Sequence, residues 1–135
     1  MTALVDTSVW VDYLRGRGSV ATRRLRTRLA LPSPEIVTTE PIAMELLAGP
    51  TAPAVVEQIT RLVDGLPTVA VQPVLDYRSA AAIFRATRLH GRQVRNLSDC
   101  LIAAIAIRSD TLLIHRDADF EAIAAVTPLR HESWC

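Results

Sequence analysis

The chain has 135 residues, of which 50% are hydrophobic and 21% are charged, and its formal net charge is +1. This composition excludes a disordered chain, and the length predicts a single domain spanning residues 1–135. No apolar run is long enough to cross a membrane and the first residues do not form a secretory signal, so we expect a soluble, cytoplasmic protein with no membrane association.

The N-terminal half predicts strands and helices in alternation. Ala3–Val5 is a short apolar run that is typical of a buried strand, and Thr7 or Ser8 is a suitable cap for the helix that follows. Ser19 is the expected cap of a second helix, whose outer face carries arginines. The remaining elements of this half are a strand at Ile36–Thr38, a helix that starts at Thr39 and ends at Gly49, and a helix from Pro53 to Gly65.

The C-terminal half continues the alternation. Ser98 is the expected cap of the most apolar helix of the chain, which should be buried on all sides. A long helix follows Pro73, and its expected inner face consists of Leu75, Ala82, Ile83, Ala86 and Leu89. The other elements are strands at Thr68–Val71 and Thr111–Ile114, a helix from Asp117 to Val126 and a short terminal strand near Leu129.

Strands that alternate with helices predict an α/β fold, a three-layer domain with a central parallel β-sheet flanked by helices. In such sheets, binding sites lie beyond the carboxyl ends of the strands. Asp6 directly follows the first strand, and Asp117 comes shortly after the strand at Thr111–Ile114. Their placement is the first indication of a functional site.

All fifteen basic residues are arginine, which excludes mechanisms that need a lysine, such as Schiff-base formation or a phosphate-binding P-loop. Neither Cys100 nor Cys135 stands at a zinc-binding spacing, and we expect both to be plain thiols. The arginines form two clusters, and a run of this kind is usually a solvated helix face. Beside an acidic site, however, such clusters would hold a polyanion. The candidates for these contacts are Arg15, Arg17, Arg23, Arg24, Arg88, Arg92 and Arg95.

Three acids stand among apolar neighbours. Asp6 ends a buried strand, Glu45 lies within the run Ile42–Leu47, and Asp99 opens the most apolar helix. Each alone has an ordinary explanation, such as solvent exposure or compensation of the helix dipole. Gathered in one pocket, they would repel one another by on the order of a few kcal/mol per close pair. A hard divalent cation, Mg²⁺ or Mn²⁺ in its place, would offset this repulsion and support hydrolysis of a phosphodiester.

Other functions of an acidic pocket require residues that this chain lacks. A phosphatase of the haloacid-dehalogenase type needs Asp-x-Asp after the first strand, where this chain has Ser8 in the third position. A receiver domain needs its lysine, and no Gly-x-Gly-x-x-Gly segment supports a dinucleotide site. A triad of Ser8, His115 and an aspartate has no Gly-x-Ser-x-Gly turn to support it.

Four segments resemble, in order, the motifs of the PIN-domain nucleases. They are Leu4–Trp10 around Asp6, Met44–Gly49 around Glu45, Ser98–Ala104 around Asp99, and His115–Phe120 around Asp117. The match covers the whole chain, and its spacings are those of the bacterial VapC-type toxins of toxin–antitoxin pairs.

The resemblance implies a PIN fold and an endoribonuclease activity that depends on Mg²⁺ or Mn²⁺. Carried over position by position, the catalytic quartet consists of Asp6, Glu45, Asp99 and Asp117, with the metal held by Asp6, Asp99 and Asp117. Asp119 corresponds to an aspartate that assists the metal site in some members. Ser8 or Thr7 would orient Asp6. His115 departs from the Thr or Ser of many relatives, so its supporting role stays open.

The expected reaction is in-line attack of metal-activated water on an RNA phosphodiester, which leaves 5′-phosphate and 3′-hydroxyl ends. The substrate could be transfer, ribosomal or messenger RNA, and Arg15 and Arg92 are the first candidates for backbone contacts. The resemblance further implies a homodimer and neutralisation by a cognate VapB-type antitoxin, which the apolar helices at Ala43–Leu47 and Val55–Leu62 could accommodate.

Two alternatives stay within the same fold. One is a PIN nuclease that acts in RNA processing outside toxin–antitoxin systems. The other is a non-catalytic RNA-binding adaptor, which the retention of all four acids disfavours. An unrelated α/β phosphatase is a third, weaker alternative.

Overall fold

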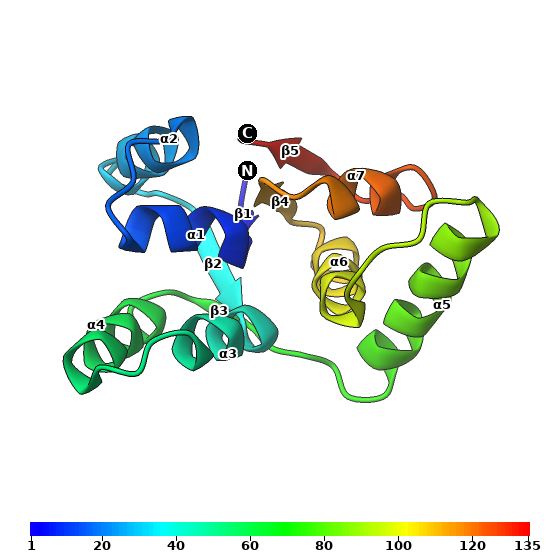
Figure 1. Cartoon of the computed structure of the whole chain (residues 1–135), viewed down its shortest axis with the longest axis horizontal. Coiled ribbons are helices and arrows are strands. Elements are labelled where there is room, and N and C mark those ends of the chain that lie inside the picture. Colours follow the sequence, from blue (N-terminus) through cyan, green and yellow to red (C-terminus); the bar gives the residue numbers. More distant parts are fainter.

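The computed structural model describes residues 1–135 and is built on a five-stranded sheet (Figure 1). Its strands are β1 (Ala3–Val5), β2 (Ile36–Thr39), β3 (Thr68–Val69), β4 (Leu112–His115) and β5 (His131–Ser133). They run in the order β3-β2-β1-β4-β5, and every neighbouring pair is parallel. This confirms the expected α/β fold with a central parallel sheet.

Seven helices flank the sheet on both faces, as a three-layer domain requires (Figure 1). They are α1 (Thr7–Leu14), α2 (Val20–Leu29), α3 (Glu40–Ala48), α4 (Pro53–Asp64), α5 (Leu75–Leu89), α6 (Leu97–Ser109) and α7 (Ala118–Ala124). The chain winds outward from β1 to β3 and then returns to build β4 and β5 on the other side of β1. Because crossovers between parallel strands are right-handed, this reversal places the later helices on the opposite face. None of the helices has the length and hydropathy that a membrane crossing requires.

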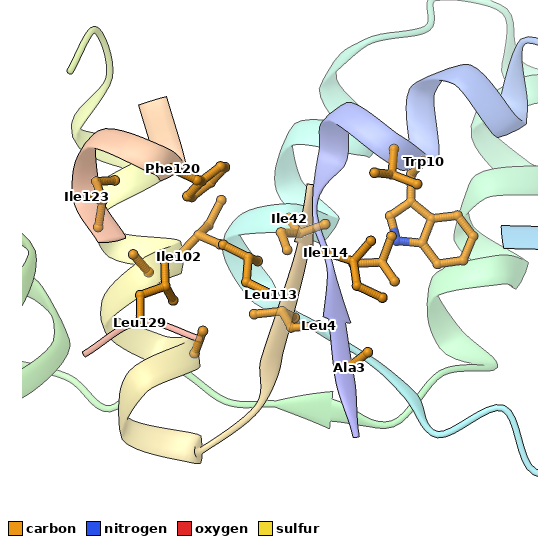
Figure 2. Close-up of a cluster of buried hydrophobic side chains, with 14 of the residues drawn as sticks. Ala3, Leu4, Trp10, Ile42, Ile102, Leu113, Ile114, Phe120, Ile123 and Leu129 are labelled. Carbon is orange, nitrogen blue, oxygen red and sulfur yellow. The ribbon is translucent and has the colours of Figure 1, made fainter. Parts of the chain in front are cut away.

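The hydrophobic core occupies both sides of β1 and β4. Trp10 of α1 lies on one face, while Phe120 of α7 and Ile102 of α6 lie on the other (Figure 2). Residues 3–5 are fully buried, because these strands are covered by helices on both faces. Helix α6 is also buried along residues 102–106, as its apolar sequence predicts.

Two helix starts differ from the sequence prediction. The cap of α1 is Asp6 itself, whose side chain accepts a hydrogen bond from the Ser8 amide, rather than Thr7 or Ser8. The helix α6 begins two residues early, at Leu97 with Asn96 as its cap, so Ser98 lies inside the helix. Both Asp6 and Ser98 therefore stand at the start of a helix that leads into the site described below.

The inner face of α5 also differs from the prediction. Its buried residues are Asp76, Ala80, Ile83 and Thr87, whereas the expected Leu75 and Leu89 are exposed. The reason is that two polar residues of this face find partners inside the fold: Asp76 pairs with Arg108, and the Thr87 hydroxyl donates to the Phe84 carbonyl. Apolar periodicity alone cannot identify a face that is buried through satisfied polar groups.

Candidate active site

The candidate site lies beyond the carboxyl ends of β1 and β4. The order in which strands are added reverses at this pair, so the loops after them diverge to opposite faces of the sheet and leave a crevice. Asp6 follows β1, and its amide donates to the Ile114 carbonyl of β4 at 2.8 Å. Asp117 follows β4 and caps α7 by accepting a hydrogen bond from the Asp119 amide at 3.0 Å. The sheet therefore brings together residues that are more than a hundred positions apart.

Asp99 on α6 completes a compact group of carboxylates. One oxygen from each of Asp99, Asp117 and Asp119 lies within 4.8 Å of the others. Glu45 enters from the opposite side of the crevice on α3, where its Oε1 accepts a hydrogen bond from Thr7 Oγ1 at 3.3 Å. Four elements thus contribute acids to one small volume.

The pKa values of Asp6, Glu45 and Asp99 are raised both by burial and by repulsion from neighbouring acids. Burial, followed by the charges of Asp6, Asp117, Glu45 and Asp119, raises the pKa of Asp99 to about 7. Burial is also the main cause that raises the pKa of Asp6, and Asp117 adds to it. The pKa of Glu45 is raised first by burial and then by Asp6. Asp6, Glu45 and Asp99 are each affected by the charge of another acid, so the pocket acts as one electrostatic unit.

Two buried oxygens in this unit have no hydrogen-bond partner, Asp6 Oδ1 and Asp99 Oδ2. A buried carboxylate oxygen without a donor is costly, and a bound cation is one way to offset that cost. The donor set is made only of oxygens and several are negatively charged, which is what Mg²⁺ and Mn²⁺ prefer. The residues present therefore fit a hard divalent cation.

Ser8 fixes the orientation of Asp6. Its hydroxyl donates to Asp6 Oδ2 at 2.6 Å and accepts a hydrogen bond from the Arg116 amide at 3.1 Å. The Ser8 amide donates to the same oxygen at 3.0 Å. Oδ2 is therefore occupied, and the unpartnered Oδ1 is the atom of Asp6 that is left for a cation.

His115 is fully buried at the end of β4 and supports the turn that carries Asp117. Its Nδ1 accepts a hydrogen bond from the Asp117 amide at 3.1 Å, so the ring proton lies on Nε2 and is donated to His131 Nδ1 at 2.9 Å. Burial, followed by the neighbouring His131, lowers the pKa of His115 to about 4. The structure therefore places a neutral histidine behind the acids.

The arginines proposed for RNA contacts occupy different surroundings. Arg23 donates to the Gly18 carbonyl, Arg24 pairs with Glu132 at 2.7 Å over the Trp134 ring, and Arg88 lies over the Phe84 ring. Arg17 lies 3.6 Å from Asp12. The remaining three are Arg15, Arg92 and Arg95. Arg15 lines a cleft that also contains Glu45, and Arg95 pairs with pocket acids. The Arg92 amide donates to the Thr87 carbonyl, but its side chain forms neither a hydrogen bond nor an ion pair.

Sequence reasoning missed Asp12 and Arg116. Asp12 is buried on α1 and forms an ion pair with Arg116, which stands between His115 and Asp117. The pair ties the turn after β4 to α1, and the Arg116 amide contacts Ser8. Asp12 appears in the sequence as an ordinary acid on a helix, so only the position of Arg116 next to Asp117 could have drawn attention to the pair.

Two cavities adjoin the acidic crevice. A cleft of about 200 Å³ lies between α1, α3 and α4 and is lined by Leu14, Leu46, Val55 and Ile59 together with Glu45. A larger cavity of about 640 Å³ lies between α3, α6 and the segment before α5. Its lining includes Met44, Tyr77 and Ser98, the residue that precedes Asp99.

Comparisons with known proteins agree on one family. The PIN domain family model matches residues 3–126. The VapC ribonuclease Mb1587 of Mycobacterium bovis and the ribonuclease VapC11 of Mycobacterium tuberculosis are each 46% identical to this chain over 131 residues, which is 97% of this chain and 98% of the relative.

Solved structures of low sequence identity share the fold. VapBC2 of Rickettsia felis, solved with a DNA fragment from its promoter, superposes with a TM-score of 0.76 at 14% identity and covers both chains in full. VapC20 of Mycobacterium tuberculosis, a toxin that cleaves the sarcin-ricin loop, superposes with a TM-score of 0.63 at 21% identity, over 96% of this chain and 99% of that one.

Proposed function

The chain belongs to the PIN-domain family and, within it, to the VapC ribonucleases, and we propose from this premise that its acidic crevice is the active site of a Mg²⁺-dependent endoribonuclease toxin that acts in the cytoplasm. The observation that carries the proposal is the convergence of Asp99, Asp117 and Asp119 within 4.8 Å, next to the unpartnered oxygens of Asp6 and Asp99. Mg²⁺ is the expected ion and Mn²⁺ its substitute.

Asp6, Asp99 and Asp117 would hold the cation, with Asp119 at its edge. When bound, the cation neutralises charge on the phosphate and makes water more acidic, which is the chemistry that phosphodiester hydrolysis needs. Ser8 contributes by fixing Asp6 Oδ2, so that Oδ1 is directed into the pocket without a change of rotamer. Preorganised ligands of this kind lose little conformational entropy when they bind.

Glu45 is the acid best suited to handle a proton. It lies on α3, outside the compact group formed by Asp99, Asp117 and Asp119, and Thr7 Oγ1 holds one of its oxygens. Its pKa is raised from the ordinary value by burial and by the charge of Asp6. A carboxylate with a raised pKa accepts a proton more readily, so we assign Glu45 the role of positioning the attacking water and taking its proton.

The substrate is RNA, in keeping with the ribonucleases to which the chain is similar. Arg15 and Arg92 are the arginines that remain available for its phosphates, because Arg23 and Arg24 already bind groups of this chain. The chain is low in aromatic residues, at 4%, so stacking on bases is a minor contribution and the shape of the RNA would guide recognition.

We also propose that a cognate VapB-type antitoxin neutralises the toxin by binding the cleft between α1, α3 and α4. The cleft is apolar along Leu14, Leu46, Val55 and Ile59, which suits the apolar side chains of a docked segment. Glu45 belongs to the same lining. A basic side chain of the antitoxin would therefore meet a catalytic acid when the segment is in place.

The experiment that tests the function is cleavage of total RNA by the purified chain with Mg²⁺ and with excess EDTA. Cleavage should require the metal and should fall by at least about a hundredfold in Asp6→Asn and Asp99→Asn, because each variant removes one charged ligand. Asp64→Asn, an exposed acid at the end of α4, is the matched control and should cut like the parent. Equal cleavage by all four proteins would disprove the catalytic assignment.

A further inference from the structure

Arg95 lies in the loop that joins α5 to α6, which runs beside α7 (Figure 1), and it contacts two acids of the site. Its amide and its Nε donate to Asp119 Oδ2 at 3.2 and 3.1 Å, and its Nη2 lies 3.1 Å from Asp117 Oδ1. The guanidinium therefore spans two of the three carboxylates that could hold a metal ion.

Arg95 is the one cationic side chain paired with this pocket. Every other ion pair of the structure involves acids outside the five pocket carboxylates. Like charges that are this close repel one another strongly. A single guanidinium that contacts Asp117 and Asp119 together relieves part of this repulsion, and its two-pronged shape suits a pair of carboxylates better than a lysine would.

We propose that Arg95 is a tethered counter-ion that occupies the rim of the metal site and is exchanged for the divalent cation when the metal binds. The inference rests on the proposed function, because it assumes that Asp117 takes part in metal binding. A guanidinium and a dication compete for the same oxygens and repel each other. Arg95 thereby weakens metal binding and sets the metal concentration at which the enzyme becomes active.

The geometry permits this exchange at small cost. The Arg95 side chain is 72% exposed, so its charge is readily hydrated once it leaves the carboxylates. The Arg95 amide continues to hold Asp119 Oδ2 after the side chain has moved, which keeps Asp119 in place. The release therefore requires only new side-chain rotamers and no change in the fold.

Arg92 offers a matched comparison. It belongs to the same loop and carries the same charge, but it forms no ion pair with any acid, in contrast to Arg95. A general electrostatic effect of a nearby arginine would appear in both Arg92→Gln and Arg95→Gln. A direct exchange at Asp117 and Asp119 would appear only in Arg95→Gln.

The test measures the Kd for Mn²⁺ by titration calorimetry, and the Tm in EDTA and in saturating Mn²⁺. We expect Arg95→Gln to bind Mn²⁺ about three- to tenfold more tightly, as the loss of exposed ion pairs suggests. Its Tm should be lower than that of the parent in EDTA and equal to it in saturating Mn²⁺. Arg92→Gln should match the parent in all three measurements.

Other results would overturn the inference. An unchanged or weaker affinity of Arg95→Gln for Mn²⁺ would exclude the exchange, and a Tm that is lower by the same amount with and without Mn²⁺ would indicate a purely structural role. Asp99→Asn separates this failure from that of the proposed function: if the parent and Asp99→Asn bind Mn²⁺ equally, or neither binds it, there is no metal site for Arg95 to regulate.

Discussion

Asp99 illustrates the cost of gathering carboxylates in one pocket. The residue is 7% exposed and one of its oxygens lacks a hydrogen-bond partner. Burial and four neighbouring acids raise its pKa to about 7. The ionised form that a metal needs is therefore the form that destabilises the metal-free fold. The repulsion therefore lowers the unfolding free energy of the metal-free protein, and a bound cation would recover this loss.

Because of the raised pKa of Asp99, the stability of the metal-free protein depends on pH, and the sign of this dependence can be derived. The pKa of Asp99 is near 3.8 in the unfolded chain and about 7 in the fold, so between these values the folded state retains a proton that the unfolded state releases. The contribution of Asp99 to the free energy of unfolding is therefore lost as the pH rises from about 4 to about 7. Asp99→Asn removes the loss, so in EDTA its advantage in unfolding free energy over the parent should grow across this range, to on the order of 2 kcal/mol.

Urea unfolding of both proteins at several pH values measures this difference. His115 titrates in part of the same range with the opposite sign, because its pKa is lowered to about 4 and its contribution is lost as the pH falls. That effect is common to both proteins and cancels. Saturating Mn²⁺ at pH 7 should reverse the order, since only the parent keeps the full set of ligands. A difference that does not change with pH would contradict the assignment of the raised pKa to Asp99.

At the scale of secondary-structure elements, the pairing of α5 with α6 depends on a partly buried ion pair. Arg108 of α6 donates through Nε to Asp76 Oδ1 at 2.8 Å and through Nη2 to Asp76 Oδ2 at 2.9 Å. Asp76 is 1% exposed and also accepts a hydrogen bond from the Gln72 amide at 2.7 Å. The pair therefore fixes the C-terminal end of α6, and Asp99 lies at the other end of the same helix.

Replacing Asp76 should destabilise the protein far more than replacing an exposed acid. Asp76→Asn leaves the Arg108 guanidinium without its charged partner, and breaking such a pair costs about 2–4 kcal/mol. Denaturant unfolding against the control Asp64→Asn measures the cost. The Kd of the folded variant for Mn²⁺ should stay within about twofold of the parent, because the metal ligands themselves are unchanged. A loss below about 0.5 kcal/mol would show that the pair is not a structural clamp.

At the scale of the whole molecule, five large apolar side chains are exposed in or next to the lining of one cavity. Met44, Val74, Leu75, Tyr77 and Leu97 are each 51% to 64% exposed. Met44 and Tyr77 line the cavity between α3, α6 and the segment before α5, whose lining contains no arginine. Val74 and Leu75 follow its lining residue Pro73 in the chain, and Leu97 precedes its lining residue Ser98. Val74 has a φ of 70°, which is rare for a β-branched residue and is a local cost. We propose that a second copy of the chain covers this face, because a two-fold interface pairs such an apolar patch with itself.

The homodimer can be tested by light scattering coupled to size exclusion. The parent should elute with twice the mass of the chain, and Tyr77→Glu should elute as a monomer, because a charge at the centre of an apolar contact is poorly solvated. Leu89→Glu is the control, since Leu89 is 85% exposed at the far end of the same helix and lies outside the cavity. A monomeric parent, or a dimeric Tyr77→Glu, would argue against this interface.

Much of the fold follows from local patterns. The strand at Ala3–Val5, the Ser19 cap and the buried helix around residues 102–106 are as predicted, because each depends on neighbours in the chain. The inner face of α5 was predicted wrongly because Asp76 and Thr87 are buried through polar partners that the sequence does not reveal. The four acidic motifs were apparent from the residues, whereas the pairing of Arg95 with Asp117 and Asp119 was not.

Local residue patterns establish which elements form and which acids end the strands or open the helices, since these features depend on apolar periodicity and on capping residues within a few positions. The meeting of those acids depends instead on how distant elements pack. The order of the strands brings Asp6 beside Asp117, the packing of α6 adds Asp99, and a loop from the far end of α5 places Arg95 against them. Charge interactions depend on distances in space, and residues a hundred positions apart come close together only once the sheet has formed.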